Sequence, residues 1–215
     1  MSSLDLLSIG RVSVDLYAEQ PGVTMSDVTT FRKSIGGTAT NVAVATARYG
    51  HAVALATRVG DDQFGRYVAD ALRNMFNVDP RFVATHPTLK TPLAFAELDP
   101  PEDPTIIFYR EPAAPDMEIE TTPPLLDAVD TARILWIPAS RFAFDRSRTT
   151  VTELLQRRNR KHHTVLDLDW RPMFWDSEEQ AHAAISPMLD HVTIAIGNRK
   201  ECEVAVGTDD PDEAA

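Results

Sequence analysis

Short, mostly apolar segments alternate with segments of helical periodicity along this 215-residue chain, and this alternation restricts its fold more than any other feature. Buried strands are expected where such apolar segments lie between turn residues, at 4–9, 53–59, 134–137, 164–168 and 192–196. Strands that alternate with helices form parallel sheets with helices on both faces. The sequence therefore predicts an α/β protein with a Rossmann-like, three-layer core.

Amphipathic periodicity marks the helices between these strands. Small and apolar residues recur at helical spacing over 39–47 and stop at Gly50, a residue type that often ends helices. Apolar residues over 64–76 share one face of the clearest helix, and Asp61 or Asp62 is expected to cap its N-terminus. Further helices are predicted around 151–155 and from about Asn198.

Two stretches depart from the alternation and predict a small second sheet. The first, at about 11–34, holds a partly alternating polar run and then a turn at Pro21-Gly22. The second, at about 88–111, holds two apolar runs joined by the sequence DPPEDP. It predicts a β-hairpin, because proline is confined to its turn. Both insertions are expected to form a lid over a site at the C-terminal ends of the parallel strands of one domain, 1–215.

Bulk properties restrict the compartment and the class of partner. The longest apolar runs are much shorter than the roughly 18 residues of a transmembrane helix, and no basic segment precedes the apolar N-terminus. The single cysteine, Cys202, cannot form an internal disulfide. We therefore predict a cytoplasmic protein without a membrane partner. The formal net charge of −11 disfavours a nucleic acid partner, because phosphate backbones attract basic surfaces.

The first candidate ligand-binding residues surround a diglycine. Gly36 and Gly37 precede a predicted helix whose first turn contains Asn41. Glycine lets the backbone approach a ligand closely, and the free amides of a first helical turn donate to hydroxyl or anionic oxygens. A plain strand-to-helix turn is the alternative interpretation. Asp15, at the start of the predicted second sheet, is either a ligand for two adjacent sugar hydroxyls or a solvated strand residue.

Charged residues also gather where two predicted strands end. Asp167 and Asp169 follow the strand at 164–168 and are expected to project to the same side. Arg171 comes next, at the strand exit where ligands of open sheets bind, and Arg110 ends the predicted hairpin. Two arginines that converge on one cleft would grip a carboxylate in bidentate fashion, whereas separate arginines would be solvated surface residues.

Asn198 and Glu201 open the last predicted helix and have the spacing of a capping box. One turn apart, they are also placed to orient a hydrated Mg²⁺ ion and the phosphates of a nucleotide. The two interpretations are compatible.

Together and in this order, these motifs resemble the ribokinase-like (PfkB) carbohydrate kinases. The resemblance covers nearly the whole chain and rests on the spacing from Gly10 to Asp15 and on the segments GGTATN, TRVGDDQFG, DLDWR and NRKE. It implies a Rossmann-like core with a β lid that is often used for dimer contacts. It also implies ATP-dependent phosphorylation of a sugar, assisted by Mg²⁺.

Four sequence segments resemble most closely those of the family members that phosphorylate 5-dehydro-2-deoxygluconate in inositol catabolism: SIGRVSVDLYAEQ, FRKSIGG, FYRE and DLDWRPMFW. The 2-keto-3-deoxygluconate kinases come second in this resemblance. The resemblance implies three groups of ligand-binding residues: Asp15, Gly36, Gly37 and Asn41 for sugar hydroxyls, Arg110 and Arg171 for the acid end, and Asn198 and Glu201 for Mg²⁺ and phosphate. Asp169 stands where many relatives have asparagine.

One family motif is not found in the sequence. The G-A-G-D stretch, which supplies an anion hole and the base for the attacking hydroxyl, normally follows N-x-x-E, and the 215 residues do not contain it. We therefore expect an incomplete ribokinase-like domain with little or no activity of its own, because general-base help is worth ~10²–10⁴-fold. A neutral-sugar kinase and a non-catalytic sugar-binding or dimerisation module are the alternative hypotheses.

Overall fold

The main sheet has six parallel strands in the order β10-β9-β8-β1-β4-β5. It is seen in a computed structural model that describes residues 3–100, 102 and 104–214. The strands of this sheet are β1 (Leu6–Ile9), β4 (Val53–Gly60), β5 (Val83–His86), β8 (Ile134–Pro138), β9 (His163–Asp167) and β10 (Ile194–Ile196).

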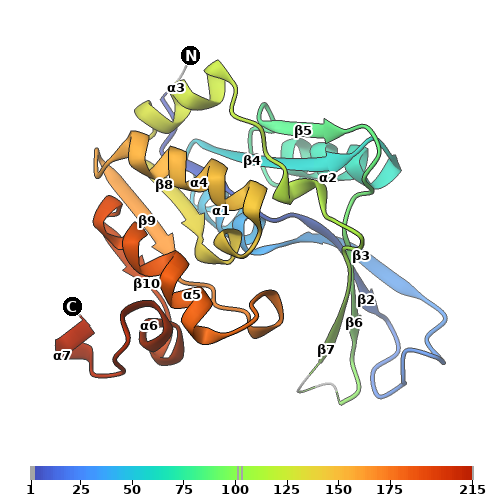
Figure 1. Cartoon of the computed structure of the whole chain (residues 1–215). Coiled ribbons are helices and arrows are strands. Elements are labelled where there is room, and N and C mark those ends of the chain that lie inside the picture. Colours follow the sequence, from blue (N-terminus) through green and yellow to red (C-terminus); the bar gives the residue numbers. More distant parts are fainter. Residues whose placement is uncertain (1–2, 101, 103, 215) are drawn as a thin grey trace.

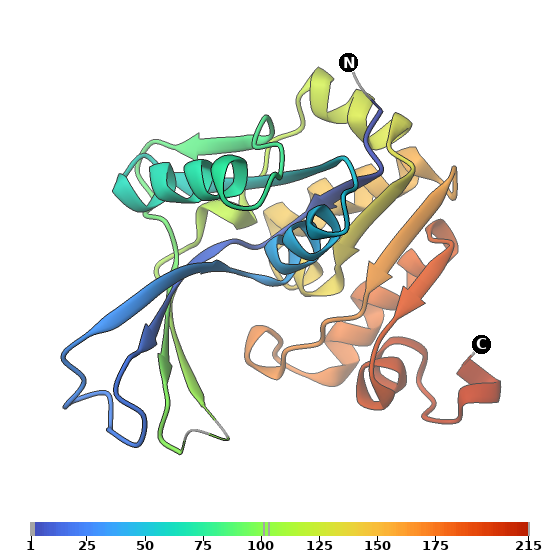
Figure 2. The ribbon, with the colours of Figure 1, turned by 180° about the vertical axis from the view of Figure 1, so that it is seen from behind.

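Helices cover both faces of this sheet (Figures 1 and 2). Because side chains alternate along a strand, β1 contributes to two cores: Leu6 packs with residues of α1 and α2, whereas Leu7 packs with residues of α3 and α4. The helices are α1 (Thr38–Arg48), α2 (Gln63–Asn74), α3 (Pro123–Thr131), α4 (Asp145–Arg158), α5 (Glu178–Ile185), α6 (Arg199–Val206) and α7 (Pro211–Ala214). The predicted three-layer α/β core is confirmed.

A second sheet of four strands, in the order β3-β2-β6-β7, projects from the main sheet (Figure 1). Its strands are β2 (Ser13–Ala18), β3 (Phe31–Gly36), β6 (Leu93–Glu97) and β7 (Thr105–Tyr109). The antiparallel pairing of β6 with β7 confirms the predicted hairpin. In its DPPEDP connection, Pro101 and Asp103 lie outside the described residues. The exact limits of a lid insertion remain a prediction.

Register decides which side chains share a face of the second sheet. Asp15 pairs with Ala94, which pairs in turn with Phe108, so these three side chains lie on one face. Val14 and Leu93 lie on the other face, where Val14 is buried in the core that contains α1 and α2. The root of the second sheet is therefore packed on the main domain, and one face carries Asp15.

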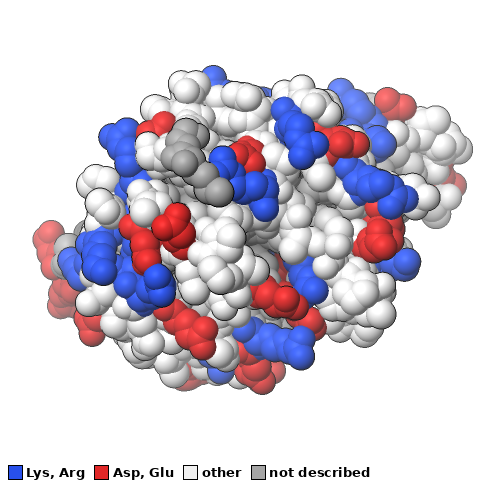
Figure 3. Space-filling view, turned by 90° about the horizontal axis from the view of Figure 1, so that it is seen from above, with Lys and Arg blue, Asp and Glu red and all other residues white. Residues whose placement is uncertain are grey.

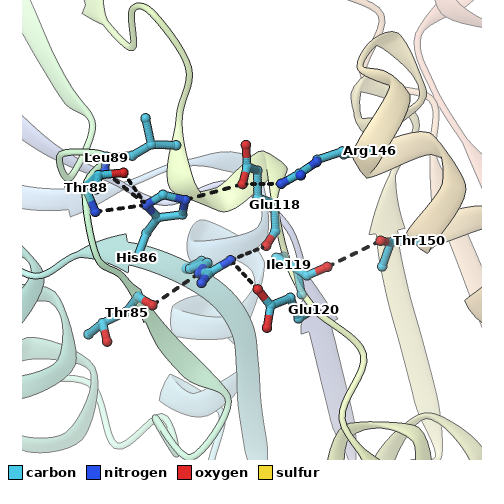
Figure 4. Close-up of polar contacts among 10 residues, drawn as sticks. Thr85, His86, Thr88, Leu89, Glu118, Ile119, Glu120, Arg146 and Thr150 are labelled. Carbon is cyan, nitrogen blue, oxygen red and sulfur yellow. Dashed lines mark hydrogen bonds and ion pairs between the residues drawn. The ribbon is translucent and has the colours of Figure 1, made fainter.

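A cluster of polar contacts joins β5 to α4 through the segment 118–120 (Figure 4). Nδ1 of His86 accepts a hydrogen bond from the backbone N–H of Leu89 (2.9 Å), and its Nε2 lies 3.3 Å from a carboxylate oxygen of Glu118. Arg146 on α4 donates to the same oxygen over 2.7 Å, and Arg58 donates to the carbonyl oxygen of Glu118. The donors and acceptors of this cluster bond to one another. We therefore interpret the cluster as a structural connection between β5, the segment 118–120 and α4.

Charged side chains of both signs are interspersed on the face seen from above, and neither sign gathers there into a continuous patch (Figure 3). Within the described residues, none of the helices combines the length and the apolar character that crossing a bilayer requires.

Candidate functional site

The β2–β3 register brings two predicted ligand-binding residues together. Asp15 pairs with Ser34 across the two strands, and Gly36 lies two residues further along β3 on the same face. A Cβ atom on Gly36 would overlap the carboxylate of Asp15, so only glycine permits this approach. Ser13 donates a hydrogen bond to Oδ1 of Asp15 over 2.5 Å, and burial raises the pKa of the Asp15 carboxyl group.

The backbone at Gly37 turns directly from β3 into α1. Gly37 is the N-cap residue of α1 and has a φ of 102°, a conformation that side chains with a Cβ disfavour. Glycine has no side chain that could cap the helix, so amides of the first turn are left to other acceptors. The backbone N–H of Asn41 bonds to Gly37 O over 2.9 Å, and the Asn41 side chain is exposed. The diglycine and Asn41 thus form one helix entrance.

A buried carboxylate links this entrance to Arg171. Asp169 is 2% exposed, and its Oδ2 accepts hydrogen bonds from Arg11 Nη2 and Ser140 Oγ, both over 2.6 Å. The same nitrogen of Arg11 donates to Thr38 Oγ1 on α1 over 2.6 Å. Arg171, which is half-exposed, forms an ion pair with Oδ1 of Asp169 over 2.9 Å. Ends of β1, β8 and β9 therefore meet the start of α1 around one carboxylate.

Arg110 is held by a second buried carboxylate, that of Asp116. The Nη2 atom of Arg110 donates to Oδ1 of Asp116 over 2.5 Å, and the backbone N–H of Val12 donates to Oδ2 over 2.9 Å. The fully buried Arg141 donates to the carbonyl oxygen of Asp116 over 2.6 Å. Asp116 thus ties the end of β7 to the connection between β1 and β2.

Asp167 and Asp169 do not share a strand face as expected. β9 ends at Asp167, and Asp169 has a φ of 28°, so strand alternation no longer applies to it. The backbone N–H of Asp169 donates to Oδ1 of Asp167 over 3.2 Å. Burial, followed by the negative charges of Asp169 and Glu201, raises the pKa of Asp167 to about 6.

The predicted capping box is present at the start of α6. Asn198 Oδ1 accepts from the backbone N–H of Glu201 over 2.9 Å, and Glu201 Oε2 accepts from that of Asn198 over 2.8 Å. Glu201 also lies close enough to Asp167 to raise its pKa, so this helix entrance adjoins the end of β9. Among the described residues, no group of three or more His, Cys, Asp or Glu side chains could hold a metal ion.

A cavity of about 400 Å³ adjoins these charged groups. Arg110 and Glu111 are the charged members of its lining, and the rest is apolar: Phe108, Pro112, Ala113, Ala114, Met117, Phe144, Met173 and Phe174. The guanidinium of Arg11 lies 5.4 Å from the centre of the Phe174 ring, which lines the cavity. Of the residues predicted from the sequence, Arg110 lines this cavity and Arg171 precedes two residues that do.

The sequence analysis missed four residues of this arrangement: Arg11, Thr38, Asp116 and Ser140. A signal existed for Arg11 and Ser140, which lie two and three residues past the predicted strands that end at Ile9 and Ile137, the kind of position where ligands of open sheets bind. Thr38 and Asp116 give no comparable signal. Their roles depend on contacts between segments that lie far apart in the chain, such as the pair of Val12 and Asp116.

The chain matches the family model described as pfkB family carbohydrate kinase over residues 3–215. It is 33% identical over 204 residues to a 5-dehydro-2-deoxygluconokinase of Geobacillus thermodenitrificans, covering 94% of this chain and 60% of the relative. A protein of the same name from Bacillus thuringiensis is 32% identical, with the same coverage. The chain thus spans 60% of the length of these curated relatives.

Solved structures share the fold. A PfkB protein from Polaromonas superposes with a TM-score of 0.85 at 24% identity, covering 99% of this chain and 72% of its own. The 2-dehydro-3-deoxygluconokinase of Thermotoga maritima gives 0.83 at 18% identity, with coverages of 95% and 63%. A sugar kinase from Pyrococcus horikoshii, solved in complex with ATP, gives 0.76 at 26% identity, with coverages of 88% and 62%.

Proposed function

The chain belongs to the pfkB family of carbohydrate kinases, and on this premise we propose that it binds a keto-deoxy sugar acid for phosphorylation by ATP. The preferred substrate is 5-dehydro-2-deoxygluconate, the substrate that the names of its curated relatives state. The observation that carries the proposal is a pair of arginines, each paired with a buried carboxylate: Arg110 lines the cavity, and Arg171 lies two residues before Met173, which also lines it. A planar guanidinium is suited to a substrate carboxylate.

The sugar hydroxyls are assigned to the opposite end of this arrangement. Asp15 is an acceptor for two adjacent hydroxyl groups, and the lack of a Cβ on Gly36 gives its carboxylate the space that it occupies. The backbone at Gly37 and the exposed side chain of Asn41 supply further donors and an acceptor. A substrate bound in this way lies between the second sheet and the entrance of α1.

ATP and Mg²⁺ are assigned to the entrance of α6, because the family resemblance implies this role for Asn198 and Glu201; a sugar kinase of the same fold was solved in complex with ATP. Mg²⁺ commonly binds through one or two carboxylates, several waters and the phosphates of the substrate. Glu201 uses Oε2 for its cap, which leaves Oε1, and Asp167 is a second carboxylate nearby. Two carboxylates fit such a partly hydrated ion, which neutralises phosphate charge when bound.

The proposed reaction is an in-line transfer of the γ-phosphoryl group. A sugar hydroxyl oxygen forms a bond to phosphorus while the bond to the ADP oxygen breaks, and the hydroxyl proton passes to a base. The residues named here bind and orient the acceptor sugar, and such positioning is a large part of catalysis in phosphoryl transfer. The base is not among them.

Two substrate alternatives are tested together with the proposal. Isothermal titration calorimetry of the chain is expected to give tighter binding of 5-dehydro-2-deoxygluconate than of 2-keto-3-deoxygluconate, and weaker binding still of fructose. Arg171→Met should weaken binding of both acids about 10- to 100-fold, the usual size of a lost charge-assisted hydrogen bond, and leave fructose unaffected. Equal losses for acid and neutral sugar, or a preference for fructose, would remove the acid-sugar assignment.

A further inference from the structure

Arg11 has an unusual position for a side chain whose role is only to neutralise a buried carboxylate. Its side chain is 9% exposed, and its one hydrogen-bonding nitrogen among the described residues, Nη2, serves both Asp169 and Thr38. Its Nε atom is buried without a partner in the described part of the chain. A buried donor that stays unpaired costs free energy unless a ligand or water satisfies it.

The surroundings of Arg11 carry an excess of positive charge. Burial lowers the pKa of Arg11, as do the charges of Arg110 and Arg171, while Asp169 and Asp116 raise it. Burial also lowers the pKa of Arg141, which is fully buried, as do the positive charges of Arg110 and Arg11. The Nε and Nη2 atoms of Arg141 lack partners among the described residues.

Three of these guanidinium groups, those of Arg11, Arg110 and Arg141, are buried or nearly so, and they face two buried carboxylates, Asp116 and Asp169. At least one positive charge is therefore left uncompensated in the buried part of the region. Glu111 reaches the cavity rim, but it is exposed to solvent, which screens its charge.

The position of Arg11 connects the two halves of the proposed substrate site. Arg11 and Arg171 bind the two oxygens of the same Asp169 carboxylate, which brings their guanidinium groups side by side. Arg11 also touches the first residue of α1, where no side chain caps the helix. On its other side it lies over Phe174 in the cavity wall.

We propose that Arg11 is a third anion-binding side chain of this site and binds the carboxylate of the sugar acid together with Arg171. Asp169 and Thr38 are positioning residues that hold its Nη2 and leave the other two nitrogens for the ligand. The inference rests on the proposed function, because it assigns to Arg11 the binding of the carboxylate of that proposed substrate.

The test compares an acid with its uncharged isostere on the whole 215-residue chain. Calorimetry gives the ratio of the Kd of 5-dehydro-2-deoxygluconamide to that of 5-dehydro-2-deoxygluconate. In Arg11→Met this ratio should fall about 10- to 100-fold while the Kd of the amide stays unchanged. The variant is expected to fold, because Asp169 keeps Ser140 and Arg171 as partners and the methionine still packs on Phe174.

Arg133→Met is the matched control, since Arg133 is an exposed arginine that pairs with Asp5 outside the site. Its ratio should equal that of the parent chain. If Arg11→Met does not give a cooperative thermal transition, Arg11→Lys takes its place as the test variant. Lysine keeps the positive charge but lacks the planar guanidinium that binds a carboxylate through two nitrogens. A ratio lowered about threefold or more in Arg11→Lys would support the proposal, and an unchanged ratio would overturn it.

The two proposals fail in different ways. If the parent chain binds acid and amide equally or binds neither, the proposed function is wrong. If the parent prefers the acid and Arg11→Met keeps that preference, or loses affinity for acid and amide alike, the function stands and Arg11 is a structural residue only.

Discussion

The carboxyl group of Asp167 ends β9 in partly buried surroundings, next to Asp169 and Glu201. These surroundings disfavour its ionised form and raise its pKa to about 6, from the usual value near 4. Between these two pH values the folded protein keeps a proton that the unfolded chain has released. The contribution of Asp167 to stability is therefore greatest at low pH and is lost as the pH rises toward and past 6.

Asp167→Asn should remove this dependence, because an amide does not ionise and its oxygen still accepts from the N–H of Asp169. The free energy of unfolding of the variant, minus that of the parent, is expected to increase from pH 4 to pH 6 and to level off above pH 7. Urea unfolding followed by circular dichroism at a series of pH values measures this difference. A difference that stays constant over the series would contradict the raised pKa.

Residue types at strand ends could be predicted, but their ion-pair partners could not. Arg110 and Arg171 follow predicted strands, so their place near the sheet edge follows from the sequence. Their partners, Asp116 and Asp169, were not predicted as such, and Arg11 meets Asp169 across 158 positions of the chain. Local patterns carry no information about such pairs, because only the packed sheet brings β1, β8 and β9 together.

At the scale of elements, the junction of β3 and α1 depends on close packing. Gly37 has a φ of 102°, and a Cβ atom there would overlap the carbonyl group of Arg11. Gly50, just past the end of α1, has a similar φ of 85° but open space around it. Substitution of Gly50 therefore measures the free-energy cost of the backbone conformation alone, whereas substitution of Gly37 adds the cost of the overlap.

Gly50→Ala should lower the free energy of unfolding by about 1 kcal/mol through backbone strain alone. Gly37→Ala should cost roughly 1–3 kcal/mol more, as overpacked sites do, and should also weaken binding of the sugar acid, because α1 must move away from Arg11. Chemical unfolding and calorimetry of both variants measure these effects. Equal losses of stability in the two variants would show that the overlap is relieved without cost.

The predictability of the elements follows the strength of their periodicity. Helix α2 was predicted together with its cap, and the structure selects Asp62, whose Oδ1 accepts from the N–H of Gly65 over 2.8 Å. The strands β3 and β5 and the helices α3 and α5 were not predicted. β3 has three polar residues in a row, Arg32 to Ser34, and β5 has only four residues, so neither stands out until a neighbouring strand pairs with it.

At the scale of the molecule, the second sheet leaves apolar side chains exposed on the face that carries Asp15. Tyr17 is 37% exposed, Ile106 42% and Phe108 45%, and the register places all of them on this face. Clustered apolar exposure of this kind marks interaction surfaces in soluble proteins. We propose that this face also contacts the same sheet of a second copy, which forms a homodimer and covers the site.

Ile106→Asp should raise the dissociation constant of this dimer at least tenfold, because it places a charge in an apolar contact without a partner. Sedimentation equilibrium over micromolar concentrations measures the constant. Tyr49→Asp is the control, since Tyr49 is 84% exposed but lies at the end of α1, outside the second sheet. A parent chain that is monomeric throughout this range, or equal weakening by both variants, would exclude the second sheet as the dimer contact. Because the same face carries Asp15, a dimer formed there should also bind the sugar acid more tightly as protein concentration rises.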